Sequence, residues 1–180
     1  ELLVLYAGNM GIMHPLDWVL DAAVSCEGLP VRFLLMGDGA RRESLQDRVE
    51  EEDIPRVSFL PYQLESRFAG IMAASDISLV ALQPGLEGLA VPSKAYTSMS
   101  AGKPLIALME PHADIARLVV EHDCGWNVTS AQELEALLRD LTERRDELAR
   151  RGRNGRKAYE QRFTRDRAVA RYVAILSQGQ

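Results

Sequence analysis

The sequence predicts an α/β protein with a doubly wound parallel sheet and extra helices toward its C-terminal end. Short continuous apolar runs, typical of strands buried on both faces, alternate with segments whose apolar residues recur at helical spacing. The 180 residues are 47% hydrophobic and 26% charged, which is the composition of one globular domain. Alternation of these two patterns favours parallel strands joined by crossover helices.

Each expected element has its own signal. Apolar runs predict strands at 2–6, 31–36, 57–60, 77–82, 105–109 and 125–128. Apolar residues that share one face predict helices around 16–23, 64–72 and 115–119. A polar helix is expected at about 41–52, and a short helix is expected to start at Ser93. The domain is expected to span 1–180, with a helical tail from about 130. In this tail Ser130 and Glu133 form a capping box, and 150–154 is interpreted as a break. A terminal helix should carry one apolar stripe, made by Val169, Tyr172, Val173 and Leu176.

Charge and cysteine content narrow the functional classes. The net charge of −5 conceals a basic tail, because the chain from Arg139 onward holds twelve basic against six acidic residues. We interpret this tail as a solvated, ion-paired face, with contact to an anionic membrane as the alternative. A nucleic-acid binder would be basic overall, so no nucleic-acid partner is expected. Cys26 and Cys124 stand in apolar contexts and are expected to be buried free thiols of a cytoplasmic protein.

One segment carries the most specific signal. Pro92 and Ser93 precede a short predicted helix, and Ser93 is a suitable N-cap because its hydroxyl can accept a hydrogen bond from the first turn. Lys94 then lies where a cation opposes the helix dipole. A bound anion, most commonly phosphate, would offset that cost. The alternative is an ordinary lysine that points into solvent.

Other candidate residues follow the predicted strands, at the edge where open parallel sheets bind ligands. The glycine-rich turn at 8–11 permits close approach of backbone amides to a phosphate, although a tight turn alone would also need glycine. The turn at 37–39 is similarly ambiguous. Asp114 is placed either to cap a helix or to hold a ligand hydroxyl. His14 and His112 are expected in loops at this edge and His122 in a helix, without metal-ligand spacing. The glycines do not fit the dinucleotide-binding pattern.

Together these residues resemble the C-terminal, donor-binding domain of retaining GT-B glycosyltransferases of the family-4 or group 1 type. The resemblance covers essentially the whole chain and is carried by the motifs at 5–11, 36–39, 92–94, 101–107 and 124–126. It implies a Rossmann-like fold, the C-terminal half of a GT-B protein that builds bacterial surface polysaccharides. It also implies an N-terminal acceptor domain, and the chain does open inside a predicted strand without a Met, as an excised half would.

The resemblance assigns roles to the candidate residues. The turn at 8–11, Ser93 and Lys94 would face the diphosphate of a nucleotide-sugar, of the UDP type by this resemblance, with no metal and no other cofactor. Leu60 and Pro61 would face the base, Tyr96 and Thr97 the ribose, and Asp114 the sugar. The full set of expected donor-binding residues is Gly8, Asn9, Met10, Gly11, Gly37, Asp38, Leu60, Pro61, Pro92, Ser93, Lys94, Tyr96, Thr97 and Asp114.

Two departures from the family pattern stand out. Thr97 occupies the position at which the family commonly has a ribose-binding glutamate, and Glu87 is out of register with the earlier acidic partner. The segment 9–29 lacks the Arg and Lys that commonly follow the first glycine turn. Lys94 would therefore supply much of the positive charge.

The resulting hypothesis is the donor-binding half of a hexosyltransferase that extends a glycan or lipid-linked acceptor at the cytoplasmic face of the inner membrane. The isolated chain is expected to bind nucleotide and to be inactive. One alternative is a fragment of a GT-B-like sugar-nucleotide epimerase. The other is a non-catalytic interaction or sensing domain, which the two departures favour.

Overall fold

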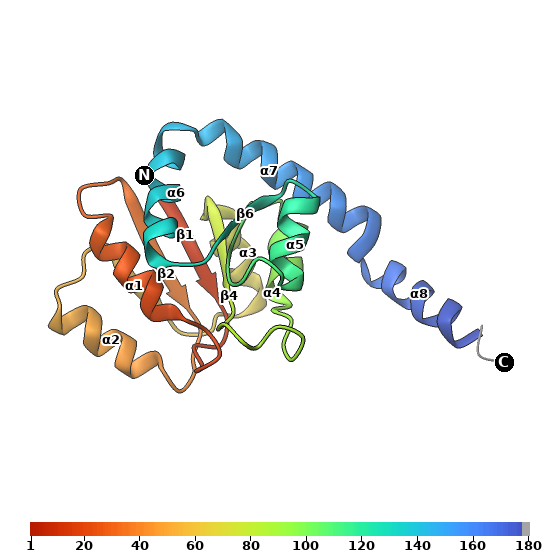
Figure 1. The fold of residues 1–180 in the computed structure, drawn as a ribbon, viewed down its shortest axis with the longest axis horizontal. Helices are drawn as coiled ribbons and strands as arrows, with labels where there is room; N and C mark the ends of the chain where they lie inside the picture. The colour runs from red at the N-terminus through yellow and green to blue at the C-terminus, as the bar shows by residue number, and fades with distance from the viewer. Residues whose placement is uncertain (178–180) are drawn as a thin grey trace.

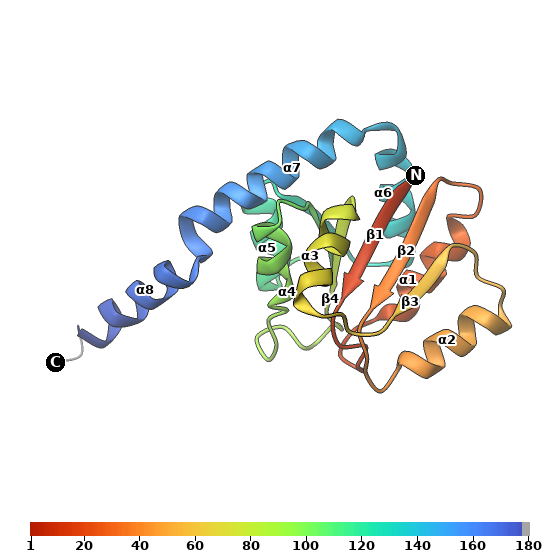
Figure 2. The same ribbon diagram turned by 180° about the vertical axis from the view of Figure 1, so that it is seen from behind.

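A computed structural model describes residues 1–177 and contains one sheet of six parallel strands, covered by helices on both faces (Figures 1 and 2). The strand order is β3-β2-β1-β4-β5-β6. The first three strands are added toward one edge of the sheet and the last three toward the other, so the strand order reverses between β1 and β4. The predicted fold class is therefore confirmed. The strands are β1 (Leu2–Ala7), β2 (Val31–Met36), β3 (Val57–Leu60), β4 (Ile77–Ala81), β5 (Leu105–Leu108) and β6 (Gly125–Val128).

The helices form two layers around this sheet. Helices α1, α2 and α6 lie on the face that is nearer the viewer in Figure 1, and α3 lies on the opposite face. The helices are α1 (Leu16–Ser25), α2 (Arg42–Glu51), α3 (Glu65–Ala74), α4 (Lys94–Ser100), α5 (Asp114–Glu121), α6 (Ala131–Glu143), α7 (Arg145–Ala158) and α8 (Arg165–Ser177), with a π-helix η1 (Tyr159–Phe163) after α7.

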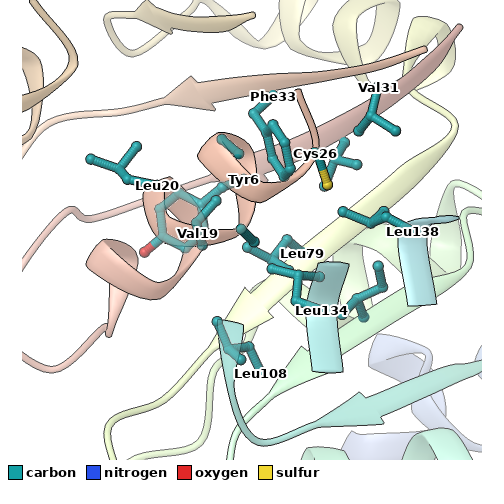
Figure 3. Packing of buried hydrophobic residues seen from close by; sticks show 14 of the residues in the cluster. Tyr6, Val19, Leu20, Cys26, Val31, Phe33, Leu79, Leu108, Leu134 and Leu138 are labelled. Carbon is teal, nitrogen blue, oxygen red and sulfur yellow. The ribbon is translucent and has the colours of Figure 1, made fainter. Parts of the chain in front are cut away.

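Alternation along each strand divides the core between the two faces. In β5, Ile106 and Leu108 pack with α1 and α6, whereas Leu105 and Ala107 pack with α4 and α5. Successive side chains of a strand point to opposite faces, so a strand buried on both sides must be apolar throughout. This is why the strands appear in the sequence as continuous apolar runs. The larger cluster is drawn in Figure 3 around Tyr6, Val19, Leu20, Phe33, Leu79, Leu108, Leu134 and Leu138.

The predicted break at 150–154 is wrong, because these residues lie inside α7. Positions 152 and 155 require glycine, because α7 packs closely on the start of β5 and on α4. A Cβ at Gly152 would overlap the Gly102 carbonyl oxygen, and one at Gly155 would lie 3.3 Å from the Cβ of Cys124. Glycine in a helix interior usually signals weakness, but here it permits close contact between backbones.

Replacing Gly152 with alanine should therefore destabilise the protein, although alanine is the better helix former. The added methyl group meets backbone atoms that cannot rotate away, so we expect a loss of about 1–3 kcal/mol in the free energy of unfolding. Thermal denaturation measures this loss. Arg153→Ala, at an exposed position of the same helix, is the control and should change stability by less than about 0.5 kcal/mol. Equal effects of the two changes would contradict the close packing.

The tail contains the predicted capping box, in modified form, and the predicted ion pairs. The Ser130 hydroxyl accepts from the Glu133 amide, and the Glu133 carboxylate accepts from the Thr129 amide, so the predicted capping box forms with its return bond one residue earlier. Arginines of the tail pair with carboxylates: Arg139 with Glu135, Arg144 with Asp140, Arg151 with Glu147, Arg156 with Glu160 and Arg162 with Glu121.

Helix α8 extends away from the body of the domain (Figures 1 and 2). Its predicted apolar stripe is present, and all four of its side chains, Val169, Tyr172, Val173 and Leu176, are exposed. Cys26 and Cys124 are buried free thiols, as predicted. Among residues 1–177, no helix is both long enough and apolar enough to cross a bilayer.

Candidate functional site

A cavity of about 470 Å³ opens at the carboxyl ends of β1 and β4, where the strand order reverses. This is the position at which open α/β sheets bind ligands. Its walls come from the turn after β1, from α3, and from the β4–α4 connection with the first turns of α4. The lining residues are Ala7, Gly8, Asn9, Met13, His14, Phe68, Met72, Ser78, Leu82, Ala90, Val91, Pro92, Ser93, Lys94, Thr97 and Ser98.

The ammonium group of Lys94 is buried in this cavity. It has no hydrogen-bond partner among the residues that the structure describes, and lies 3.9 Å from the centroid of the Tyr6 ring. It also lies against the first glycine turn, since a Cβ at Gly8 would be 2.7 Å from the Lys94 Nζ. Burial lowers the pKa of this amine to about 8. Lys94 is therefore not an ordinary solvent-facing lysine, and a cation held in this way attracts an anion.

The two titratable rings beside Lys94 carry no charge at neutral pH. The Tyr6 hydroxyl donates to the Asn9 carbonyl oxygen at 2.5 Å, and burial raises the pKa of this phenol. His14 Nδ1 donates to the Ala81 carbonyl oxygen at 2.7 Å. Burial, with a smaller contribution from the Lys94 charge, lowers the pKa of His14. The positive charge in this part of the cavity is thus that of Lys94.

The two glycine turns interlock through their backbones. Gly8 N donates to the Met36 carbonyl at 2.8 Å, and Met10 N donates to the Asp38 carbonyl at 2.7 Å. Gly37 has φ +141°, and a Cβ there would overlap the Gly8 carbonyl oxygen. The amides of Gly8 and Met10 are therefore already bonded and cannot bind a phosphate. The prediction that the whole turn at 8–11 offers its amides to a phosphate is wrong for these two residues. Within residues 1–177, the amides of Asn9 and Gly11 have no protein acceptor.

Two expected side-chain caps do not form, although Ser93 is the N-cap residue of α4 as predicted. Ser93 does precede α4, but its φ and ψ of −60° and −20° are already helical, and its hydroxyl makes no capping bond. Side-chain caps need an extended residue that turns its oxygen back onto the first amides. Asp114 is the first residue of α5 rather than its cap, a position that Ala113 holds. The Asp114 carboxylate is exposed and lies 3.4 Å from Arg117.

The structure brings together only part of the expected donor-binding set. Gly8, Asn9, Pro92, Ser93, Lys94 and Thr97 line the cavity, whereas Met10, Gly11, Gly37, Asp38, Leu60, Pro61, Tyr96 and Asp114 do not. The Leu60 carbonyl, expected to be free for a base, accepts from Gly37 N at 2.9 Å and from Arg42. Tyr96 instead packs on Phe163, with ring centroids 5.1 Å apart.

Sequence reasoning missed several lining residues. Phe68 and Met72 were interpreted only as the apolar face of a helix, and both line the cavity from α3. Ser78 and Ser98 lie within elements whose neighbours are apolar, and no local signal separates them from core residues. His14, by contrast, was expected in a loop at this edge of the sheet, and it does line the cavity. Of the other histidines, His112 is exposed and His122 ends α5 rather than lying within it.

Comparison with known proteins identifies the family. The model of the family described as glycosyl transferases group 1 matches residues 1–144. The chain belongs to this family. Probable glycosyltransferase WbjE of Pseudomonas aeruginosa is 38% identical over 125 residues, which cover 68% of this chain and 30% of WbjE. The chain thus spans less than a third of the length of this curated relative.

Solved structures of GT-B glycosyltransferases share the fold. HepE from Anabaena, solved with UDP and glucose, matches with a TM-score of 0.80 and 22% identity over 98% of this chain and 48% of HepE. The C-terminal domain of LpcC, a group 1 protein from Francisella tularensis, matches with a TM-score of 0.74 and 16% identity over 92% of this chain and 87% of that domain. At these identities the likeness shows the fold, which is the Rossmann-like half of a GT-B protein.

Proposed function

We propose that this group 1 domain binds the nucleotide-sugar donor of a glycosyltransferase, with a UDP-sugar as the first candidate. The observation that carries the proposal is the buried, unpartnered ammonium of Lys94 beside the Gly8 turn. An ion pair formed with a diphosphate would offset the cost of burying this charge. HepE, which shares the fold, was solved with UDP and with UDP-glucose, and this supports the choice of ligand.

In this proposal the domain stabilises the leaving group. When the bond between sugar and diphosphate breaks, negative charge develops on the departing phosphate, and fixed donors aimed at that charge lower the barrier most. Lys94 would supply the positive charge, and the unbonded amide of Asn9, a residue that lines the cavity, would donate a hydrogen bond to the diphosphate. We propose that no metal ion takes part. Among residues 1–177, no three His, Cys, Asp or Glu side chains gather as metal ligands would.

The remaining features concern the longer protein. We propose that a second domain binds the acceptor, a glycan or lipid-linked sugar at the cytoplasmic face of the inner membrane, and that a hexose is transferred with retention. The isolated domain should then bind donor without turning it over. A second relative, named putative colanic acid biosynthesis glycosyl transferase WcaI of Escherichia coli, is 23% identical over 64% of this chain, and its name supports this setting.

Thermal denaturation of the domain with UDP, GDP and CDP, each with and without its sugar, tests the proposal. At a hundred times its dissociation constant, a ligand stabilises the native state by about 2.7 kcal/mol. For a domain of this size that corresponds to a rise in Tm of about 5–10 °C. A melting curve unmoved by any nucleotide would favour the interaction-domain alternative.

Nucleotide affinity should fall above pH 8. The pKa of Lys94 in the free domain is about 8, so at pH 9 most of the amine is neutral and must take up a proton to bind the diphosphate. We expect Kd for UDP to rise about tenfold between pH 7 and pH 9, with uptake of nearly one proton. The phosphates of UDP, whose last pKa is near 6, stay ionised over this range.

Calorimetry in buffers of different ionisation enthalpy measures this proton uptake. Lys94→Arg is the control, because a guanidinium stays charged, so the affinity of this variant for UDP should not fall between pH 7 and pH 9. Without nucleotide the linkage has the opposite sign. The folded pKa of Lys94 lies below its unfolded value, so the stability of the free domain should rise between pH 8 and pH 10.5. An affinity that is constant from pH 7 to pH 9 would contradict the role of Lys94.

A further inference from the structure

The cavity has a second feature beyond its charge, namely the chemistry of its half between α3 and α4. Phe68 and Met72 contribute a phenyl ring and a thioether to this half. With a diphosphate on Lys94, the flat apolar face of a nucleobase fits here, because aromatic and thioether groups pack on such rings. This placement of the nucleoside rests on the donor-binding function proposed above.

Hydroxyl groups are the polar side chains of this half, and most are already bonded. Ser78 and Ser98, 3% and 1% exposed, share a hydrogen bond of 2.6 Å between their hydroxyls. Ser98 Oγ also donates to the Lys94 carbonyl oxygen at 3.1 Å. Thr97 is exposed on the cavity wall, and neither its hydroxyl nor that of Ser93, one helical turn earlier, has a protein partner in the described residues.

Ribose differs from deoxyribose only in its 2′-hydroxyl, so a site separates them only by hydrogen bonds to that group. A carboxylate accepts strongly from the two neighbouring hydroxyls of ribose, and leaving it unpaired opposite a deoxyribose would be costly. A single exposed threonine hydroxyl can turn to water when the ligand has no hydroxyl to offer.

We infer that this site accepts 2′-deoxyribonucleoside diphosphates about as readily as ribonucleoside diphosphates, so that deoxythymidine diphosphate sugars belong to its donor class. The 5-methyl group of thymine would add an apolar contact to Phe68 and Met72.

Measuring Kd for UDP, dUDP and dTDP on the unmodified domain tests the inference. UDP and dUDP differ only in the 2′-hydroxyl, and their Kd values should agree within about fivefold, the value of one neutral hydrogen bond. dTDP should bind at least as tightly as dUDP. UDP that binds more than about a hundredfold tighter than dUDP would overturn the inference and leave the donor-binding function standing. Failure of all three nucleotides to bind would overturn both.

A substitution at Thr97 gives a second, internally controlled test. Thr97→Glu places a carboxylate on the same wall, at an exposed helical position that tolerates glutamate. The preference for UDP over dUDP should then rise at least about tenfold. Because the readout is a ratio, weaker binding of both nucleotides by repulsion does not affect it. Thr97→Val should change the ratio of the two Kd values by no more than about fivefold. A selective loss of UDP well beyond fivefold in Thr97→Val would show that this hydroxyl already distinguishes ribose from deoxyribose, against the inference.

Discussion

Replacing Lys94 with methionine should abolish nucleotide binding and, at the same time, stabilise the free domain. The ammonium is buried without a hydrogen-bonding partner in the described structure, and its lowered pKa of about 8 reflects the cost of that burial. Methionine fills a similar volume without charge. We expect a gain on the order of 1–3 kcal/mol in the stability of the free domain at pH 7. We also expect at least about a hundredfold loss of affinity for UDP, because charged contacts in desolvated sites contribute several kcal/mol.

Lys103→Met is the matched control, and its effects on stability and on UDP affinity should both differ from those of Lys94→Met. Lys103 Nζ donates to the carbonyl oxygens of Ala73 and Ser75, at 2.7 and 2.6 Å. It thus caps the C-terminal end of α3, away from the cavity. Its loss should lower stability by about 1–2 kcal/mol and leave UDP affinity unchanged. Thermal denaturation with and without UDP measures both quantities for the two variants. A Lys94→Met protein that is less stable than the unmodified domain, or that still binds UDP tightly, would refute the assignment.

Among the glycines that the structure describes, Gly37 should be the one at which an alanine substitution lowers stability most. Gly37 has φ +141°, a conformation that alanine rarely adopts, and its Cβ would overlap the Gly8 carbonyl oxygen and lie 2.8 Å from the Gly8 carbonyl carbon. Both obstacles are backbone atoms at the ends of adjacent central strands. We expect a loss of about 4 kcal/mol or more, which lowers Tm by at least about 8 °C. Any folded fraction should bind UDP poorly, since the Gly8 turn must move.

Two other glycines separate the causes of this loss. Gly28 has φ +82° with nothing within 4 Å of the added Cβ, so Gly28→Ala tests backbone strain alone and should cost about 1 kcal/mol. Gly70 lies within α3 with open space around it, and Gly70→Ala should raise stability by about 0.5–1 kcal/mol. Denaturant titrations of the three variants give the comparison. If Gly37→Ala costs no more than Gly28→Ala, the interlocked turns do not have the role described.

The fold could be predicted from the sequence because its strands are buried on both faces. The run of β5 is apolar at every position and that of β4 at every position except Ser78, and such runs are rare outside parallel sheets. Helix termini and breaks were predicted less well. Gly152 and Gly155 were interpreted as a break because the same residue serves both for chain flexibility and for close packing. Only the neighbouring backbone, which is distant in sequence, decides between the two.

The candidate site was predictable in its charge and not in its walls. Gly8 and Lys94 follow β1 and β4, and placing these strands side by side brings the two residues together. Which amides remain unbonded depends on the second glycine turn, and no local pattern shows that Met36 and Asp38 accept from Gly8 and Met10. Phe68 and Met72 have the spacing of core residues, since one apolar helix face can cover both a sheet and a cavity.

Helix α7 determines where an independently folding unit can end. The family match stops at residue 144, yet α7 begins after it and places Leu148 in one half of the apolar interior and Ala158 in the other. Truncation at residue 144 would uncover Met99 and Cys124, beside which Gly155 packs. Recombinant versions of this domain, and chimaeras that exchange it between transferases, therefore require their C-terminal junction beyond Phe163, some twenty residues past the end of the family match.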